Sequence, residues 1–456
     1  MNAPAKSLRE RASASNPPTD RASASGGRNE RTTPSRPPAE RPSASKPPAP
    51  RASTWPTATG PADPLLGGVV VALVVFGVVM VYSASAVLAY QRHDDGSYFL
   101  IRQSLYAAVA LPLAFGLARL DYHRLRPLTY PMLLASAGMM LATTLGFGSS
   151  AGGAARWIAV GPVHVQPAEV TKLALIAWLA YSLSKKSERI RTFSIGFLPH
   201  VVVAGVLMAL CMRQPDFGSA VMLGLLTFVM LFTAGARVGY MLGAGLLAAP
   251  VAWHLVAGSE YRMRRITAFL SPFEHRSNEG YQVAESLISL GSGGVRGVGI
   301  GDSHQKLFFL PEAHTDFIGA IIGEELGFIG LCALILAYGV LIWRGMRAAY
   351  DAADDYGVYL ATGVTTFLGL QAFTNLAVAV GLLPTKGLVL PFVSYGGSAL
   401  LVNCAAIGIV LNVSRPRGEP ATARSHPPEA AEPPGTEGTD LAFVCLAAPN
   451  AGEPRR

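Results

Sequence analysis

Ten long apolar stretches constrain the fold of this chain more than any other feature. An α-helix rises 1.5 Å per residue, so about 20 apolar residues cross the roughly 30 Å hydrocarbon core of a bilayer. Only 14% of the residues are charged, whereas soluble proteins carry charges at about a quarter of their positions. The sequence therefore predicts an all-α polytopic membrane protein with ten transmembrane helices, at residues 65–89, 99–118, 128–147, 167–184, 195–213, 215–234, 237–257, 315–343, 356–381 and 387–413.

Basic residues in the short connecting segments predict the orientation of these helices. Cytoplasmic loops are enriched in Lys and Arg, and such residues follow the second, fourth, sixth and eighth stretches, namely Arg119, Arg124, Arg126, Lys185, Lys186, Arg189, Arg191, Arg237, Arg344 and Arg347. Both termini are therefore expected in the cytoplasm. A large extracytoplasmic loop, residues 258–314, would separate helices seven and eight, and a short helix at Tyr281–Leu290 is expected to lie on the membrane surface.

The two ends of the chain are predicted to be disordered cytoplasmic tails on either side of a membrane domain at 61–414. Residues 1–60 repeat Arg-Ala-Ser-Ala-Ser among Pro-Pro pairs, and residues 415–456 are rich in Pro, Glu and Ala. The basic residues of the first tail are scattered without aromatic neighbours, so no nucleic-acid partner is expected. The first apolar stretch is long enough to span, which indicates an uncleaved signal anchor.

The four cysteines, Cys211, Cys332, Cys404 and Cys445, show neither a disulfide framework nor metal-ligand spacing. We therefore expect no metal site built from cysteine.

Asp316 is the first candidate for a functional residue, because it stands where a polar, Pro-containing segment enters the eighth apolar stretch. Ionisable groups at membrane depth are costly and usually mark function. Thr315 is expected to cap the helix that follows. A structural alternative is that Asp316 only complements the positive end of the helix dipole.

Two more helices are expected to begin with acidic residues on the same face, after Gln166-Pro167 and Gln214-Pro215. Helix N-termini can bind anions, but Glu169 and Asp216 could instead neutralise the dipole internally. Lys172 lies three residues after Glu169, so the two side chains could form a closed ion pair or leave a cation beneath a polar entrance.

Several arginines and one broken segment complete the candidates. Arg213 precedes Gln214, and Arg262, Arg264 and Arg265 begin the long loop; arginine binds phosphate bidentately, although headgroup anchoring explains the loop cluster equally well. The glycine-rich segment Gly291–Gly301 lacks the context of a nucleotide-binding loop and indicates turns. Segment Leu383–Ser398 contains two prolines and three glycines at membrane depth, which favours a protein-lined site.

Five motifs then resemble the SEDS family (shape, elongation, division and sporulation), in its FtsW-type division branch. They occur in the family's order between residues 64 and 414: Gly153-Ala-Ala-Arg-Trp-Ile158, Gln166-Pro-Ala-Glu-Val-Thr-Lys172, Gln214-Pro-Asp-Phe-Gly-Ser219, Leu310-Pro-Glu-Ala-His-Thr-Asp-Phe317 and Pro391-Phe-Val-Ser-Tyr-Gly-Gly-Ser398. Lys386 departs from the Thr-Gly that the family often has at that point.

The resemblance implies a peptidoglycan glycosyltransferase that polymerises lipid II at the division septum of the bacterial inner membrane. It implies that Asp316 is the catalytic aspartate. The candidate substrate-binding residues are Lys172, Glu169, Arg213, Gln214, Asp216, His314, Ser394 and Ser398. A class B penicillin-binding transpeptidase, other divisome proteins and membrane lipids would be partners. No organic cofactor is expected, and the sequence does not show whether a divalent cation helps.

A second interpretation belongs to another class of protein, a flippase that carries lipid II across the membrane. Ionisable groups inside a helical bundle suit a transporter as well. A flippase needs polar residues along its whole path, however, and the unusual residues here gather on one predicted face. That distribution favours chemistry over transport.

Overall fold

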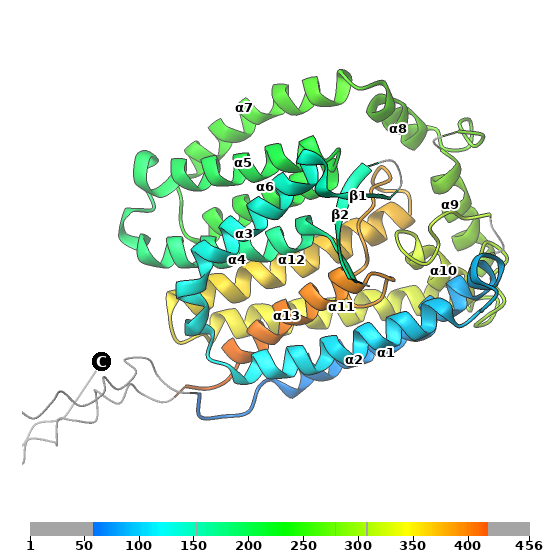
Figure 1. Ribbon diagram of the computed structural model, residues 1–456, viewed down its shortest axis with the longest axis horizontal. Coiled ribbons are helices and arrows are strands. Elements are labelled where there is room, and N and C mark those ends of the chain that lie inside the picture. The colour runs from blue at the N-terminus through cyan, green and yellow to red at the C-terminus, as the bar shows by residue number, and fades with distance from the viewer. Residues whose placement is uncertain (1–57, 152–153, 162, 279, 307–308, 418–456) are drawn as a thin grey trace, which may run out of the picture. The chain divides into compact units, whose positions relative to one another are not determined.

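The computed structural model describes residues 58–417 except 152–153, 162, 279 and 307–308, and Figure 1 shows a bundle of helices lying side by side. The two predicted tails lie almost wholly outside the described residues. Six helical segments are long and apolar enough to cross a membrane: α1 (Pro64–His93), α2 (Tyr98–Arg119), Tyr122–Phe147, Phe193–Arg213, α7 (Val238–Ala257) and α11 (Gly327–Tyr350). A polytopic, mostly helical membrane protein is thereby confirmed.

Two of these six segments are composites. The segment Tyr122–Phe147 joins η1 (Tyr122–Leu128), α3 (Thr129–Ala142) and η2 (Thr143–Phe147). The segment Phe193–Arg213 joins η4 (Phe193–Phe197) and α5 (Leu198–Arg213).

Four further helices match the remaining apolar stretches: α4 (Pro167–Lys185), α6 (Phe217–Thr233), α12 (Asp355–Ala379) and α13 (Gly397–Val413). Helix α12 packs against α4, α6, α11 and α13, and buries polar side chains such as Gln371 and Asn375. A helix surrounded by protein does not need an apolar surface on every side, which explains why α4 and α12 are less apolar than the outer helices.

Small residues allow a close contact between α2 and α13. The face of α2 that is turned inward carries Ala107, Ala110, Ala114 and Ala118, all buried. Helix α13 lies along this face, and a Cβ added at Gly408 would collide with the Ala114 carbonyl. Two helices can approach this closely only where side chains are small.

Two predicted helices were wrong in their bounds. The eighth is divided into α10 (Ile318–Glu325) and α11, because Gly327 takes a left-handed conformation (φ 69°) that turns the chain. The backbone of the preceding loop docks at this turn, where the Phe328 N–H donates to the Gly294 carbonyl at 2.9 Å. The tenth begins only at Gly397, because the proline-containing segment 382–396 is not helical.

The all-α prediction was also wrong between α3 and α4, where the chain forms a small sheet. Strands β1 (Ser149–Ala151), β2 (Ala154–Val160) and β3 (Val163–Val165) pair antiparallel in that order. A short hairpin between β2 and β3 uses the β-branched residues that the sequence places there. The sheet carries the chain across the end of the bundle to the start of α4 (Figure 1).

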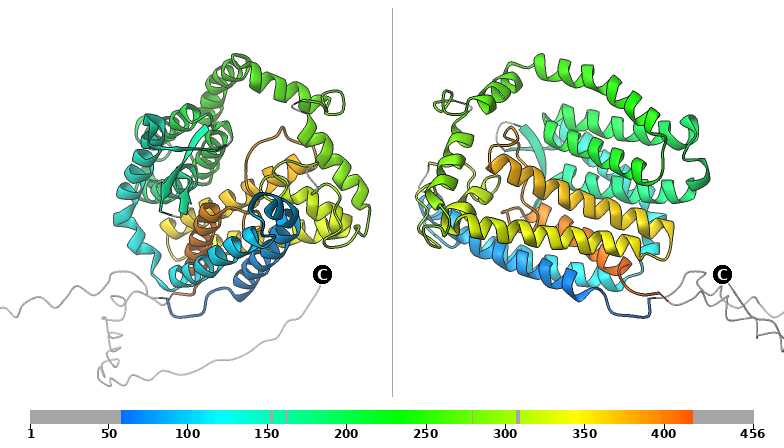
Figure 2. Two further views of the ribbon diagram at one scale, coloured as in Figure 1. Left: turned by 45° about the vertical axis from the view of Figure 1, so that its right-hand side comes forward. Right: turned by 180° about the vertical axis from the view of Figure 1, so that it is seen from behind.

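The long loop 258–314 contains two helices, α8 (Glu260–Leu270) and α9 (Tyr281–Gly293). The second confirms the short helix predicted at Tyr281–Leu290. It packs against α10, where Gly293 meets the Gly323 carbonyl so closely that no side chain fits. Helix α7 lies at the edge of the bundle in every view, with only Met241 buried (Figure 2).

At the end of the bundle away from α10, charged residues and the two ends of the described chain meet. Asp354 accepts hydrogen bonds from Tyr122, His123, Arg126 and the Gly357 N–H. Asp63 pairs with Arg344 at 2.6 Å. Ala58 and Arg417 form an isolated antiparallel bridge, so the two ends of the described chain lie side by side.

Candidate functional site

Asp316 lies in a turn two residues before α10. The Glu312 carbonyl accepts the N–H groups of Thr315, Asp316 and Phe317, which fixes a tight turn with Glu312 at a positive φ of 56°. The Thr315 hydroxyl donates to the Glu312 carbonyl at 3.2 Å and to its carboxylate at 3.0 Å. Thr315 therefore does not cap the helix, contrary to prediction, because the helix starts later than expected.

The Asp316 side chain is half-buried, and among the described residues it accepts no hydrogen bond. Burial, and then the negative charge of Glu312, raises its pKa to about 7; the positive charges of Arg265 and Arg156 act in the opposite direction. A carboxyl group with a pKa near neutrality can exchange a proton at physiological pH. The Asp316 carboxylate therefore makes no hydrogen bond among the described residues that would stabilise the fold.

The backbone around Asp316 is held firmly even though its side chain is not. Asn375 on α12 donates to the carbonyls of Asp316 at 2.9 Å and Leu388 at 2.6 Å. The Ser394 hydroxyl donates to the Thr315 carbonyl at 2.6 Å and accepts from the Leu390 N–H. The turn that carries Asp316 is thus connected to segment 382–396 twice, directly through Ser394 and indirectly through Asn375, which also binds the Leu388 carbonyl.

Gly387 leaves room for the carboxylate. A Cβ built at this position would lie 3.3 Å from Asp316 Oδ2. The next residue back, Lys386, lies 5.3 Å from the centroid of the Phe217 ring, and burial lowers the pKa of its ammonium group. Segment 382–396 therefore brings the Lys386 cation close to the site, in addition to the backbone at Gly387 and Leu388.

His314 points into an aromatic cluster. Its ring lies 4.8 Å from the Phe99 ring and 5.7 Å from the Tyr395 ring, and its carbonyl accepts the Tyr395 N–H. Burial lowers the pKa of this histidine, so the ring is neutral at pH 7. The structure places His314 as a packing residue behind the turn.

Arg213 and Gln214 occupy different environments. Arg213 is exposed at the end of α5, and Gln214 is buried, donating to the Met140 carbonyl at 2.9 Å. A residue that we did not single out, Arg156 on β2, binds this corner: its guanidinium donates to the carbonyls of Gln214 at 3.0 Å and Pro215 at 2.6 Å. Gln214 therefore links the end of α5 to α3, and Arg156 supplies a positive charge at the Gln214–Pro215 corner.

Asp216 and Ser398 hold the starts of helices. Asp216 caps α6 by accepting the Ser219 N–H at 3.0 Å and hydroxyl at 2.7 Å. The Ser398 hydroxyl donates to the His164 carbonyl and accepts the Gln166 N–H. Helix α4 does begin at Pro167 as predicted, whereas α6 begins at Phe217, beyond Pro215.

Lys172 and Glu169 form the closed ion pair that we considered as the structural alternative. Their side chains are 2.6 Å apart, and Lys172 is fully enclosed against the Phe367 ring of α12. A lysine in this position has no open face for a substrate in this conformation. Lys172 nevertheless places a positive charge within α4, five residues after its first residue, Pro167.

Two arginines of the long loop contact elements of the site. Arg265 donates to the Thr385 carbonyl at 3.2 Å, whereas Arg262 donates to the Leu255 carbonyl of α7 and lies 5.9 Å from the centroid of the Phe217 ring. The sequence did not indicate the roles of Arg156 and Asn375. Arg156 stands within a motif and Asn375 within none, and only the fold shows what they contact. Within the described ranges no group of three or more His, Cys, Asp or Glu is placed to hold a metal ion.

Comparisons with known proteins agree with this geometry. The family model described as cell cycle protein, covering the FtsW, RodA and SpoVE types, matches residues 64–419. A probable peptidoglycan glycosyltransferase FtsW of Geobacter metallireducens is 47% identical over 77% of this chain and 94% of its own length. Stage V sporulation protein E of Bacillus subtilis is 40% identical over 77% of this chain and 97% of its own length.

Solved structures show the same fold. A chain from a peptidoglycan synthase complex that coordinates polymerization and crosslinking superposes with a TM-score of 0.65 at 29% identity, covering 78% of this chain and 98% of that chain. The rod shape determining protein RodA of Thermus thermophilus superposes with a TM-score of 0.56, also at 29% identity, covering 78% and 97%. Since the family model spans most of the sequence, this chain belongs to the SEDS family of FtsW-, RodA- and SpoVE-type cell cycle proteins.

Proposed function

We propose that this protein is a peptidoglycan glycosyltransferase that polymerises lipid II during septal cell-wall synthesis. One observation carries the proposal: the Asp316 carboxylate accepts no hydrogen bond from the described residues, although its backbone is clamped by α12 and segment 382–396. Its pKa of about 7 suits a general base. The name of the relative with 47% identity, a probable peptidoglycan glycosyltransferase FtsW, supports the same activity, and the family description, cell cycle protein, supports the cellular process.

In the proposed reaction Asp316 accepts the proton of an acceptor sugar hydroxyl. The hydroxyl oxygen forms a bond to the donor anomeric carbon, while the bond from that carbon to the diphosphate breaks and the diphosphate leaves with the electron pair. Arg156 and Arg265 would offset the charge that develops on the leaving group, and the exposed Arg213 would bind it at the edge. Proton transfer to a positioned base typically contributes roughly 10²–10⁴-fold in rate.

The remaining finer points of topology and assembly form part of the same proposal. We infer ten membrane crossings with both termini in the cytoplasm, loop 258–314 on the opposite side, and location in the bacterial inner membrane at the septum. The first and last described residues, Ala58 and Arg417, form a bridge, and two such residues on one side of a membrane require an even number of crossings between them, which supports this count. A class B penicillin-binding transpeptidase is the proposed partner, because a structural relative belongs to a complex that couples polymerization to crosslinking.

The test is polymerisation of labelled lipid II by the purified protein with its transpeptidase partner, read out as glycan chain length. Asp316→Asn and Asp316→Ala should make no detectable polymer while the protein still inserts and binds its partner. Asp302→Asn is the matched control, because Asp302 is an exposed acid in the same loop. Normal chain length from either Asp316 variant would refute the general-base role.

A parallel measurement of lipid II movement across partner-free vesicles separates the transferase from the flippase. If vesicles moved lipid II in an Arg213-dependent manner while Arg213→Ala still polymerised it, the transferase assignment of this site would be abandoned.

A further inference from the structure

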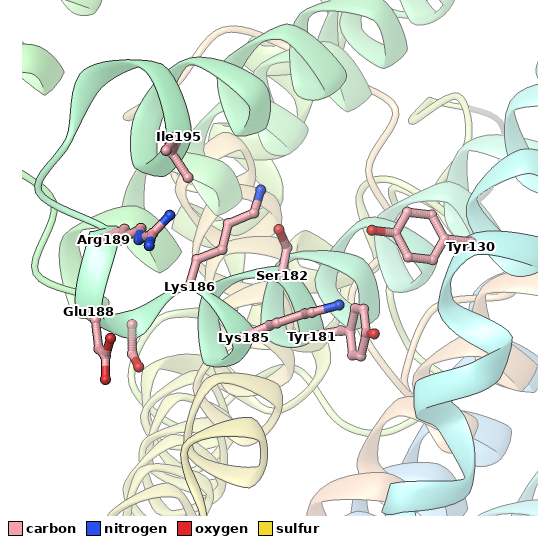
Figure 3. A pocket seen from close by; sticks show the side chains of 9 residues that line it. Tyr130, Tyr181, Ser182, Lys185, Lys186, Glu188, Arg189 and Ile195 are labelled. Carbon is pink, nitrogen blue, oxygen red and sulfur yellow. The ribbon is translucent and has the colours of Figure 1, made fainter. Parts of the chain in front are cut away.

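A second candidate site lies at the other end of α4, about 27 Å along the helix from Pro167 at 1.5 Å per residue. A pocket of about 520 Å³ opens there between α3, the end of α4, the turn η3 (Ser187–Arg189) and the start of η4 (Figure 3). Pockets of this size hold small-molecule ligands. Nothing in the proposed transferase mechanism uses it.

The lining of this pocket carries an excess of positive charge. Lys185, Lys186 and Arg189 line it, against a single acid, Glu188. Figure 3 shows the Lys186 ammonium and the Arg189 guanidinium extending into the same space, while the Glu188 carboxylate points the other way. Among the described residues none of the three cations forms an ion pair, whereas other basic residues at this end of the bundle do, in the pairs Arg126–Asp354, Arg344–Asp63 and Arg417–Asp121. Three unpaired cations around one cavity favour an anionic ligand.

The aromatic residues of the pocket are of the kind found at the level of lipid headgroups. Tyr130 and Tyr181 meet edge to face with ring centroids 6.0 Å apart, and tyrosines with this amphipathic character are typical of the membrane–water interface. On the opposite side of the pocket Ile195 lines it and exposes 41% of its surface, and Phe193, two residues earlier in the chain, exposes 47%. The cationic pocket therefore has exposed apolar side chains at the edge where Ile195 lines it.

The helical segment that begins at Phe193 adds to the positive potential. The first N–H groups of a helix have no partner within it and attract anions, and Ile195 in this first turn lines the pocket. The partial positive charge at this helix start offsets the partial negative charge at the C-terminal end of α4, which ends at Lys185. The cations and the helix start thus act on the same space.

We propose that this pocket binds the phosphate of an anionic phospholipid, with the headgroup among Lys185, Lys186 and Arg189 and the acyl chains on the shoulder formed by Phe193 and Ile195. The phosphate is the feature that the cations recognise. The apolar shoulder is the reason to assign it to a lipid instead of a free phosphate. With the orientation proposed above, the lipid would come from the cytoplasmic leaflet, where anionic lipids accumulate.

The experiment measures lipid retention by the full-length protein. Protein reconstituted in nanodiscs of phosphatidylcholine with a minor share of phosphatidylglycerol is transferred to detergent, and native mass spectrometry counts the phosphatidylglycerol molecules that remain bound. The double variant Lys186→Gln/Arg189→Gln should retain this lipid roughly thirtyfold more weakly, since each cation near an anionic lipid contributes about a factor of five. Arg191→Gln is the matched control, because Arg191 is a basic residue of the same connection, is exposed, and does not line the pocket.

The outcomes separate the possible explanations. Equal loss of lipid in Arg191→Gln would show a general effect of loop charge and overturn the site. Displacement by glycerol phosphate but not by chloride at equal ionic strength supports phosphate recognition, and equal displacement by both salts overturns it. Binding of inorganic phosphate to lipid-free protein as tightly as phosphatidylglycerol overturns the assignment to a lipid. Thermal unfolding of each variant in detergent checks the fold, and Lys186→Gln alone, expected to weaken retention about fivefold, replaces the double variant if that one fails to fold.

Discussion

Asp316 and Asp354 are both acids at helix starts, but they lie at opposite ends of the bundle and in opposite kinds of environment. Asp354 accepts hydrogen bonds from Tyr122, His123, Arg126 and the Gly357 N–H. The Asp316 carboxylate accepts none from the described residues, and its only strong neighbours act through space. One acid is part of the framework, while the other is left available.

The pKa values of the two acids express this difference. Burial alone would raise the pKa of Asp354, but the hydrogen bonds from His123 and Tyr122 lower it to about 2. Burial and Glu312 raise that of Asp316 to about 7. Ionised Asp354 therefore stabilises the fold above its unfolded pKa of about 4, a contribution lost as the pH falls towards 2. Ionised Asp316 has the opposite sign: the fold loses stability as the pH rises from about 4 through 7. The ionised form of Asp316 thus lowers the free energy of unfolding, whereas the ionised form of Asp354 raises it.

The largest expected effect comes from removing the available acid. Asp316→Asn should lower polymerisation by roughly 10²–10⁴-fold, because the amide cannot accept a proton. The same variant should unfold at an unchanged or slightly higher temperature near pH 8, since it removes a buried charge without a hydrogen-bond partner. Single-turnover assays and thermal unfolding of one preparation measure both effects. A matching loss of stability would mean that Asp316 belongs to the framework after all.

The reverse pattern is expected at the paired end. Asp354→Asn should lower the free energy of unfolding by about 1–3 kcal/mol, because it removes the negative charge that accepts hydrogen bonds from Tyr122 and Arg126 in a partly buried site. Polymerisation per folded molecule should not change. Asp355→Asn serves as control, because its side chain is the exposed neighbour in the first turn of α12. Loss of turnover in folded Asp354→Asn would erase the distinction between the two ends.

A smaller effect is expected where the framework holds the reactive acid in place. Asn375→Ala removes the hydrogen bonds to the carbonyls of Asp316 and Leu388, so we expect turnover to fall about tenfold through poorer positioning of the base. The pH dependence should keep its shape, because the carboxyl itself is unchanged. Asn403→Ala is the comparison, since Asn403 is also a buried asparagine but has no hydrogen-bond partner among the described residues. Equal losses in both variants would indicate general loosening of the bundle.

The smallest effect concerns the charge that tunes Asp316. Activity should fall as the pH drops below about 7, as the carboxylate becomes protonated. Glu312→Gln removes the negative charge that helps to raise this pKa, so the acidic limb of the pH–rate profile should move down by less than about one pH unit. The maximal rate should stay the same. A shift to higher pH would contradict the electrostatic account of the site.

The sequence alone located the reactive acid but not its surroundings. Asp316 stood out because an acid at the entrance of an apolar stretch is costly. Its turn was missed because the helix was expected to continue back to Thr315, whereas the Glu312 carbonyl takes up three successive N–H groups instead. Hydrogen bonds of this kind depend on the conformation of a single residue, which composition does not show.

Partners distant along the chain were the other limit. Arg156 and Arg265 approach Asp316 from β2 and α8, two elements that apolar patterning does not predict. The fully buried pair Lys172–Glu169 shows the opposite case, since a spacing of three residues was sufficient to predict that these two side chains could meet. Local geometry was therefore readable from the sequence, and convergence of distant segments was not.

The contact between Ala58 and Arg417 brings the first and last described residues together, so the described part of the chain is nearly circular. Arg415 also donates to the Gly60 carbonyl at 2.8 Å, and the Asp63 N–H donates to the Ser414 hydroxyl at 3.1 Å. A short linker could therefore join the first and last helices directly, with new ends opened in the turn Ser187–Arg189 on the same side of the bundle. Such a circular permutant would insert α5 first and α4 last. Because the helices are held by contacts across the bundle, it should reach the same fold by a different order of insertion.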